Sequence, residues 1–323
     1  MRPTYYRLVI DWAKSVRPDG SFDVAHPQGG CLRTIPPCAG WAGIRAQLGA
    51  VAAAQRAAPG RYQLMAVLTD TPERYARPPA GCERSDIEPR SRPPRTDALP
   101  AYQDAIRAVA AEARAAGVEI PYWSPWNEPN HPYFLSPQRT RCSPSAPSAA
   151  VGPYLEMTRA MQAVLDAEPG DQQLVLGETA GLFSPSSNFT RLPEFVAALP
   201  RELVCGAAVF GQHAYVGGDD PVGRLDAALS RFKCPRKTPI WITETGAMTD
   251  EGDRCRGVHR RLTRYYRDPR VAAAFQYTLR NDDRFPTGLV TTDLKSAFPA
   301  LAEWQAWGAR RDARNPPPPS RCG

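Results

Sequence analysis

The chain of 323 residues is 42% hydrophobic and 23% charged, which is ordinary for a globular protein. No apolar run approaches the roughly 20 residues that a membrane helix needs, so we expect no membrane span. One barrel-type domain commonly reaches this length. We therefore expect a single catalytic domain over residues 1–310 and a proline-rich tail over residues 311–323.

The net charge of +7 comes largely from arginine. No basic run carries interleaved aromatic residues, so the sequence gives no sign of a nucleic-acid surface. We interpret the charge as a solvated face of the protein, with attraction to an acidic glycan as the alternative.

The eight cysteines include no Cys-x-x-Cys pair, and none is spaced with histidines as zinc ligands are. This favours disulfides in an exported protein, secreted or periplasmic, over a metal site. Residues 1–4 lead directly into a probable strand, so we expect no signal peptide within this sequence. Cys205 and Cys234 each precede one of two successive predicted strands and are expected to pair, and Cys31 and Cys38 could close a small loop. Free buried cysteines in a cytosolic protein remain the alternative.

Strand-like apolar runs and helix-like periodicities alternate along the chain. The expected strands are residues 5–11, 62–69, a run from 118 to 122 that leads to Glu128, 173–177, 207–215, 239–244 and 272–279. Helices are expected around residues 41–51, 102–113, 153–165, 192–199, 225–232, 258–266 and 298–307. Two segments rich in proline and polar residues, 77–100 and 131–152, are expected to be long loops.

This alternation implies parallel strands with right-handed crossovers. We predict an α/β protein built as a (β/α)8 TIM barrel. Only seven strands can be counted where eight close such a barrel, so one strand is expected to be missing or atypical. Reactive groups of these barrels lie at the carboxyl ends of the strands, where this assignment places Asp11, Glu128, Glu178, His213, Tyr215 and Glu244.

Two of these strand ends carry a glutamate within an aromatic and apolar setting. Residues 123–130 read Trp-Ser-Pro-Trp-Asn-Glu-Pro-Asn, and residues 239–246 read Pro-Ile-Trp-Ile-Thr-Glu-Thr-Gly. Hydrolysis of a glycosidic bond uses two carboxyl groups that flank the scissile bond. Two such strands of one barrel could direct Glu128 and Glu244 into one cleft.

Five motifs together resemble a retaining glycoside hydrolase of clan A, closest in style to glycoside hydrolase family 39 and its relatives. They occur in the family's order at Leu68–Pro72, Trp126–Asn130, His213–Tyr215, Trp241–Gly246 and Gly288–Val290. The resemblance implies that Glu128 is the general acid/base, that Glu244 is the nucleophile, and that Asn127 binds the sugar hydroxyl next to the anomeric carbon. In the clan these glutamates end strands four and seven, so the strand missing here would be the first.

The two carboxyl groups of a retaining enzyme stand about 5 to 5.5 Å apart. Glu128 must start protonated, and we expect neighbouring aromatic rings and the negative charge of Glu244 to raise its pKa. Once Glu244 is esterified that charge is gone, and Glu128 can act as the base. This mechanism needs no metal or cofactor.

His213 and Tyr215 lie two residues apart on one strand, so their side chains point the same way, and the resemblance implies that they enter the cleft. We expect Tyr215 to hydrogen-bond Glu244 and His213 to bind a sugar hydroxyl, with core packing as the alternative. Glu178 also ends a strand, but not the strand on which the clan carries its nucleophile. We expect a binding role for it at most.

Aromatic rings at the strand ends are candidate platforms for stacking on sugars, and core packing is the alternative for each. These candidates are Trp12, Trp123, Trp126 and Tyr277. The full set of expected substrate-binding residues is Asn127, His213, Tyr215, Trp126, Asp11, Trp12, Tyr277 and Glu178.

We therefore expect an exported, monomeric enzyme that hydrolyses a β-type glycosidic bond with net retention. Its partner would be a carbohydrate substrate, including an acidic or cell-wall glycan, and not nucleic acid. Three alternatives stay open: a carbohydrate-binding barrel without turnover, a transglycosylase and an inverting hydrolase. The loops at residues 77–100 and 131–152 would determine which sugar is bound.

Overall fold

A computed structural model describes residues 3–26, 43–215, 220–248, 253–281, 285–308 and 316–322. The strands are β1 (Tyr5–Asp11), β2 (Gln63–Thr69), β3 (Tyr122–Ser124), β4 (Gln173–Thr179), β5 (Val209–Ala214), β6 (Ile240–Thr245) and β7 (Val271–Gln276). The α-helices are α1 (Trp12–Ser15), α2 (Ile44–Ala57), α3 (Leu99–Ala115), α4 (Val151–Leu165), α5 (Leu192–Ala197), α6 (Arg201–Gly206), α7 (Pro221–Ser230), α8 (Arg254–Arg267) and α9 (Pro299–Gly308). Single 3₁₀ turns lie at Glu73–Tyr75, Pro89–Ser91 and Thr96–Ala98.

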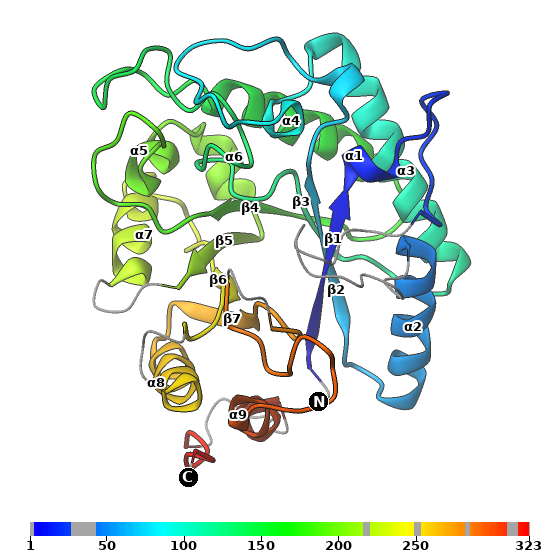
Figure 1. The fold of residues 1–323 in the computed structure, drawn as a ribbon, viewed down its shortest axis with the longest axis vertical. Coiled ribbons are helices and arrows are strands. Elements are labelled where there is room, and N and C mark those ends of the chain that lie inside the picture. Colours follow the sequence, from blue (N-terminus) through cyan, green and yellow to red (C-terminus); the bar gives the residue numbers. More distant parts are fainter. Residues whose placement is uncertain are drawn as a thin grey trace.

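The seven strands form one parallel sheet whose spatial order follows the chain from β1 to β7. The sheet curls, and the helices lie around its outer side (Figure 1). The predicted parallel α/β architecture and the count of seven strands are confirmed. A closed eight-stranded barrel is not observed, because no strand of the described residues bridges the outer edges of β1 and β7.

Apolar sequence explains why these elements form. Six consecutive residues of β2, from Leu64 to Thr69, are buried, as expected for a parallel strand covered on both faces. The helical stripe of α3 is buried as predicted, at Tyr102, Ile106, Val109 and Ala113. Gly117, with φ of 73°, follows α3 in the left-handed conformation that commonly ends a helix.

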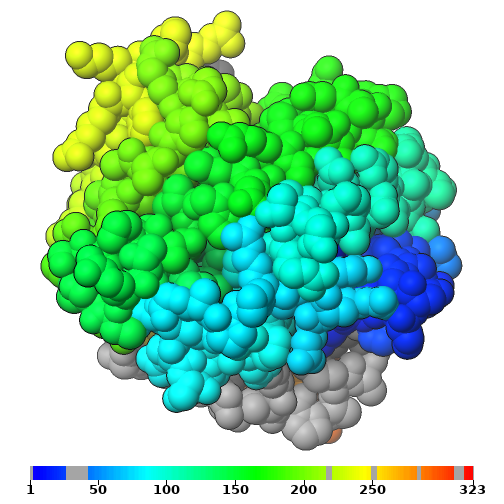
Figure 2. Space-filling view, turned by 90° about the horizontal axis from the view of Figure 1, so that it is seen from above, coloured from blue at the N-terminus to red at the C-terminus, as the bar shows by residue number. Residues whose placement is uncertain are grey.

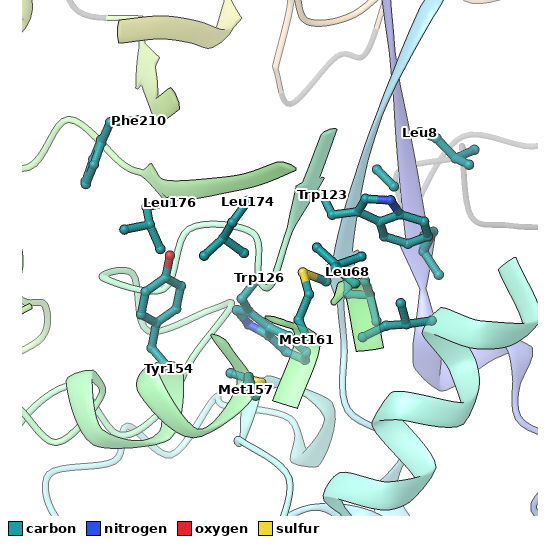
Figure 3. Packing of buried hydrophobic residues seen from close by; sticks show 14 of the residues in the cluster. Leu8, Leu68, Trp123, Trp126, Tyr154, Met157, Met161, Leu174, Leu176 and Phe210 are labelled. Carbon is teal, nitrogen blue, oxygen red and sulfur yellow. The ribbon is translucent and has the colours of Figure 1, made fainter. Parts of the chain in front are cut away.

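The largest cluster of buried apolar side chains lies between the sheet and its helices. Figure 3 shows Trp126 beside Met157 and Met161 of α4, with Leu174 and Leu176 of β4 nearby. The methionine and aromatic stripe of α4 therefore packs in the core.

Two elements differ from the prediction. The third strand is confined to Tyr122–Ser124, and the apolar run at residues 118–121 precedes it. Glu128 consequently lies four residues beyond the strand, in the turn that follows it. Helix α6 was not predicted, because its six residues follow Pro200 and are too few to show a helical period.

Two long segments border the carboxyl ends of β2 and β3, as the loop prediction required. They span residues 70–98 and 125–150 and contain no α-helix. In Figure 2 the sky-blue and cyan residues, which include much of the first segment, form a continuous part of the surface seen from above. None of the helices within the described residues is long and apolar enough to cross a membrane.

Three disulfides link the six described cysteines. The predicted pair Cys205–Cys234 is confirmed, with the two Cα atoms 5.2 Å apart. The other two bonds, Cys82–Cys142 and Cys255–Cys322, were not predicted as pairs, and the second ties the C-terminal tail to α8. Free cysteines are therefore the wrong alternative for these six, and the Cys31–Cys38 prediction lies outside the described residues.

Candidate active site

Five charged side chains from five different elements meet at the carboxyl-terminal side of the sheet. They are Arg7 of β1, Glu128 after β3, Glu178 of β4, His213 of β5 and Glu244 of β6. When His213 is protonated, two cations face three carboxylates. The network that joins them is buried almost completely.

The turn after β3 holds Glu128 in place through its backbone. The N–H of Glu128 donates to the carbonyl oxygen of Glu178, and the N–H of Asn127 donates to that of Leu68. The side chain of Asn130 accepts from the N–H of Ala180 at 2.8 Å. These bonds fix Glu128 with φ of 40°, a conformation that side chains rarely adopt and that clusters at functional sites.

Glu244 receives a hydrogen bond on each carboxylate oxygen. Arg7 Nη1 donates to Oε1 at 2.7 Å, and the Tyr215 hydroxyl donates to Oε2 at 2.5 Å. The bond expected from Tyr215 is thus present. Burial raises the pKa of the Tyr215 hydroxyl, and the negative charge of Glu244 raises it further, so this hydroxyl stays a donor.

Arg7 connects three residues of the site. Its guanidinium contacts Glu178 Oε2 at 2.6 Å, Glu244 Oε1 at 2.7 Å and Asn127 Oδ1 at 2.7 Å. Burial alone would lower the pKa of Arg7, but the charges of Glu178 and Glu244 raise it above its ordinary value. Sequence reasoning missed this residue. The available signal was an arginine in the middle of an apolar strand, where a charge needs a partner.

Glu178 lies beneath the cluster with no exposed surface. Burial alone would raise its pKa, but Arg7 and His213 outweigh burial and lower it to about 2. Its carboxylate approaches Gly211 of β5 so closely that a Cβ atom at position 211 would overlap Glu178 Oε1. The expected substrate-binding role of Glu178 stays a prediction, and in this structure the buried carboxylate accepts two hydrogen bonds from Arg7.

His213 stands among the three carboxylates and is 1% exposed. Its Nδ1 lies 2.7 Å from Glu128 Oε1 and 3.3 Å from Glu244 Oε2, and its Nε2 lies 3.6 Å from Glu178 Oε2. Burial lowers the pKa of His213, but the charge of Glu244 and the bonds to Glu128 and Glu178 raise it to about 10. The expected role of His213 in binding a sugar hydroxyl is not what this geometry provides.

The pKa of Glu128 differs from the expectation. Burial raises it, yet the hydrogen bond from His213 and the positive charge of that ring outweigh burial and bring it below the ordinary glutamate value. A raised pKa was expected because the sequence did not reveal which cation would face Glu128. Both pKa shifts favour a proton on His213 over a proton on Glu128.

The tryptophan candidates belong to the core rather than to a sugar platform. Trp12 stacks on Tyr75 with ring centroids 5.6 Å apart, and Trp126 Nε1 donates to the Phe134 carbonyl oxygen at 2.7 Å. Trp12, Trp123 and Trp126 are at most 1% exposed. An aromatic residue next to a strand end can point to either side of the sheet, and these three point toward the helices.

Tyr277 takes a different position. It follows β7 and meets Tyr215 edge to face, with centroids 6.3 Å apart, and Phe285 lies 4.6 Å from the Tyr215 ring. All three rings are partly exposed. They form an aromatic wall next to Glu244, and Phe285 was not among the predicted residues.

Asp11 caps α1 by accepting from the Lys14 N–H at 3.0 Å. This helix-capping bond gives Asp11 a structural role that the substrate-binding prediction did not include. Asn127, 7% exposed, keeps its place beside Arg7 and Glu128 at the base of the site.

Glu128, His213 and Glu244 also offer ligand atoms that lie within 4.8 Å of one another, as a metal site would. Hydrogen-bond donors already occupy these atoms, however: Arg7 and Tyr215 on Glu244, and His213 on Glu128. A guanidinium 2.7 Å from a ligand oxygen would repel a divalent cation. The cluster therefore fits an acid and base pair better than a metal centre, and it brings the two predicted glutamates together.

No family model matches the chain, and no curated protein matches its sequence. Solved structures do share its fold. A GH39 β-xylosidase from Caulobacter crescentus superposes with a TM-score of 0.56 at 16% identity, over 95% of this chain and 71% of that enzyme. The glycoside hydrolase family 30 subfamily 8 xylanase Xyn30A from Clostridium acetobutylicum gives 0.51 at 14% identity, over 93% and 70%.

A conserved exported protein from Bacteroides fragilis superposes with a TM-score of 0.57 at 14% identity, over 86% of this chain. This chain spans 60% of the length of that protein. At these identities the comparison concerns the fold. The chain has the curled parallel α/β fold of which glycoside hydrolases of families 30 and 39 are solved examples.

Proposed function

We propose that the protein is a retaining O-glycosidase that hydrolyses a β-type glycosidic bond through a covalent glycosyl-enzyme. Glu244 is the nucleophile and Glu128 the general acid/base. One observation carries the proposal: carboxylate oxygens of Glu128 and Glu244, which lie 116 residues apart in the sequence, come within 4.8 Å of each other around His213. This proximity supports retention, since inverting enzymes hold their carboxyl groups roughly 6.5 to 9.5 Å apart.

In the first step, Glu244 attacks the anomeric carbon while the leaving oxygen takes a proton from Glu128. Arg7 and Tyr215 hold the Glu244 carboxylate by both oxygens, so it keeps the orientation that attack requires. Because the pKa of Glu128 is lowered in the free protein, the proton must reach it from His213 Nδ1, 2.7 Å away.

The charge of Glu244 controls this transfer. It is the largest of the charges and hydrogen bonds that raise the pKa of His213. As Glu244 becomes an ester its negative charge disappears, His213 holds its proton less tightly, and the proton moves through Glu128 to the leaving oxygen. In the second step Glu128 takes a proton from the attacking water and returns it to His213, which restores the resting state.

The structural neighbours support the class of substrate. Two of them are named as a β-xylosidase and a xylanase, and the fold is shared over more than nine tenths of this chain. The aromatic wall of Tyr215, Tyr277 and Phe285 offers rings beside Glu244 on which a sugar face could stack. Three disulfides support an exported protein, since such bonds persist in oxidising compartments.

The test is release of sugar from a panel of β-linked plant, microbial and host glycans by four proteins. These are the native chain, Glu128→Gln, Glu244→Gln and the matched control Glu119→Gln, whose glutamate is exposed on the surface. We expect turnover to fall about 10²- to 10⁴-fold in Glu128→Gln, and at least as far in Glu244→Gln. The control should match the native chain.

The anomer released first, followed by NMR, tests retention separately. Product that survives in Glu244→Gln would refute the nucleophile assignment. An inverted first product would replace the double displacement with single displacement. Tight glycan binding with no product from the native chain would favour a binding protein, and transfer to an added acceptor in preference to water would favour a transglycosylase.

A further inference from the structure

Helix α8 carries nearly all of the protein's excess positive charge. Its sequence, RCRGVHRRLTRYYR, contains six arginines and no acidic residue, whereas the net charge of the whole chain is +7. An even distribution of surface charge would not place this excess on one element. The helix therefore presents a concentrated positive field.

The helix separates apolar and basic residues onto two faces. Val258, Leu262 and Tyr265 are buried against the rest of the protein, on the side facing the sheet and α9 (Figure 1). The opposite face carries four exposed arginines at helical spacing, Arg256, Arg260, Arg264 and Arg267. These four, here called the arginine stripe, extend over about 16 Å at 1.5 Å per residue.

A groove of about 870 Å³ runs beside the carboxyl-terminal part of the stripe. Its lining includes Arg260, Arg264, Arg267 and Arg270, together with one carboxylate, Asp268. Asp268 is bonded to Arg270 at 2.6 Å, and the lining holds three more arginines than carboxylates.

The stripe is only partly neutralised by the protein itself, and Arg256 pairs with Asp253 at 3.2 Å. Arg264 pairs with Asp220 at 3.2 Å, and both side chains are about half exposed, so the pair is weak and can exchange for a ligand. In the described part of the chain no carboxylate forms an ion pair with Arg260 or Arg267. A guanidinium offers paired donors that match a carboxylate or sulfate group.

The groove lies away from the candidate active site. Helix α8 follows β6, whose carboxyl end carries Glu244, and runs back so that Arg270 directly precedes β7. The carboxyl-terminal part of the stripe is thus at the opposite end of the strands. A ligand bound there would leave the cleft open.

We infer that the arginine stripe and its groove bind an acidic polysaccharide, one that bears carboxylate or sulfate groups. Among the described residues that line the groove the one ring is that of His259, whose Nδ1 bonds Glu303 at 2.8 Å, and there is no Phe, Tyr or Trp on which a nucleic-acid base could stack. The choice of a polysaccharide rests on the proposed function, whereas binding of a polyanion rests on the charge alone. Such binding would retain a glycosidase on the matrix that holds its substrate.

The experiment measures affinity for polygalacturonate and dextran sulfate, with neutral dextran as the reference, at about 20 mM and 300 mM salt. The native chain is compared with the stripe variant Arg260→Gln/Arg264→Gln/Arg267→Gln. A control variant, Arg17→Gln/Arg56→Gln/Arg107→Gln, removes three exposed arginines elsewhere. Both variants carry a net charge of 7 − 3 = +4.

We expect the native chain to bind both acidic polymers and not dextran, and to lose most of this affinity at 300 mM salt. The stripe variant should bind about tenfold more weakly at low salt, and the control variant within about twofold of native. Hydrolysis of a small substrate should be equal in all three. That readout separates failure of this inference from failure of the proposed function.

Three results would overturn the inference. The native chain could fail to bind either acidic polymer, or the two variants could weaken binding equally, which would reduce the effect to net charge. Tighter binding of duplex DNA or of vesicles rich in anionic lipid than of either polysaccharide, at the same salt, would assign the stripe to another class of partner.

Discussion

The same strands carry packed aromatic rings at the amino end of the sheet interior and a network of charged side chains at the carboxyl end. At the amino end, Tyr5, Tyr122, Trp241 and Phe275 pack against one another, with ring centroids 4.6 to 5.7 Å apart between Trp241 and its three neighbours. At the carboxyl end, Arg7, His213 and three glutamates form a network of hydrogen bonds. A single residue of β1, Tyr6, lies between Tyr5 and Arg7 in the sequence.

The stability of the two ends depends differently on pH and on the identity of the neighbouring side chains. Aromatic packing is insensitive to pH and tolerates a ring of similar size. The charged end is stable only while every buried charge keeps its partner, because an unpaired charge in this environment is costly. The amino end can therefore supply stability at every pH. The carboxyl end cannot, and its charges would also change in the proposed mechanism.

Removal of Arg7 is expected to have the largest effect. Arg7→Met leaves Glu178 buried without its main cation and should lower the free energy of unfolding by about 3 to 5 kcal/mol at pH 7, measured with urea. Arg7→Met/Glu178→Gln should recover more than half of the loss. A cost for the single variant below about 1 kcal/mol would mean that the network does not depend on Arg7.

A cavity at the aromatic end should cost less and show no dependence on pH. Phe275→Ala removes a ring that is 8% exposed, and we expect a loss of about 3 kcal/mol. Phe275→Leu, the milder control, should lose about 1 kcal/mol. The difference from the native chain should be the same at pH 6 and pH 9, and a change with pH would contradict the separation of the two ends.

The charged end should make stability fall in alkaline solution. The pKa of His213 is raised to about 10 in the folded protein from an ordinary value near 6.5. Its contribution is therefore complete below about pH 6.5 and is lost as pH rises through about 10. His213→Gln should flatten this part of the unfolding curve, whereas Phe275→Ala should run parallel to native.

The smallest change concerns a single hydroxyl. Tyr215→Phe removes the donor to Glu244 Oε2 and should cost about 1 kcal/mol of stability, while turnover falls about 10- to 100-fold. Tyr5→Phe changes the corresponding hydroxyl at the aromatic end and should cost less than about 0.5 kcal/mol, with turnover unchanged. Equal effects of the two variants on turnover would remove Tyr215 from the proposed mechanism.

Periodicity in the sequence was sufficient to predict most of the fold. The short apolar run Leu64–Leu68 of β2 indicated a buried strand and the periodic stripe of α3 an amphipathic helix, so the type and order of these elements could be predicted. Short elements gave no such signal. The three residues of β3 and the six residues of α6 are too few to show a strand or helix period in the sequence. Tertiary contacts set the limits of both elements.

The candidate site was harder to predict because side-chain direction depends on local irregularities. Alternation along β6 from inward-facing Trp241 would turn Glu244 outward. The register between β5 and β6 shifts so that Thr243 is an extra residue and Glu244 pairs with His213. A similar shift brings Glu178 of β4 inward. The partners of Glu128 and Glu244 follow from these shifts. The sequence could therefore suggest the glutamates and mark Arg7 as a charge that needs a partner, but it could not place Arg7 between them.

The contact between Gly211 and Glu178 restricts how this sequence can change over time. A methyl group at position 211 would overlap the carboxylate of Glu178, so replacement of the glycine requires that carboxylate to shift or position 178 to hold a shorter residue. That change would in turn leave Arg7 without its buried partner. The three positions should therefore vary together or not at all. In distant homologues the trio Arg7, Glu178 and Gly211 should mark shared descent more reliably than overall identity, because each member makes the other two necessary.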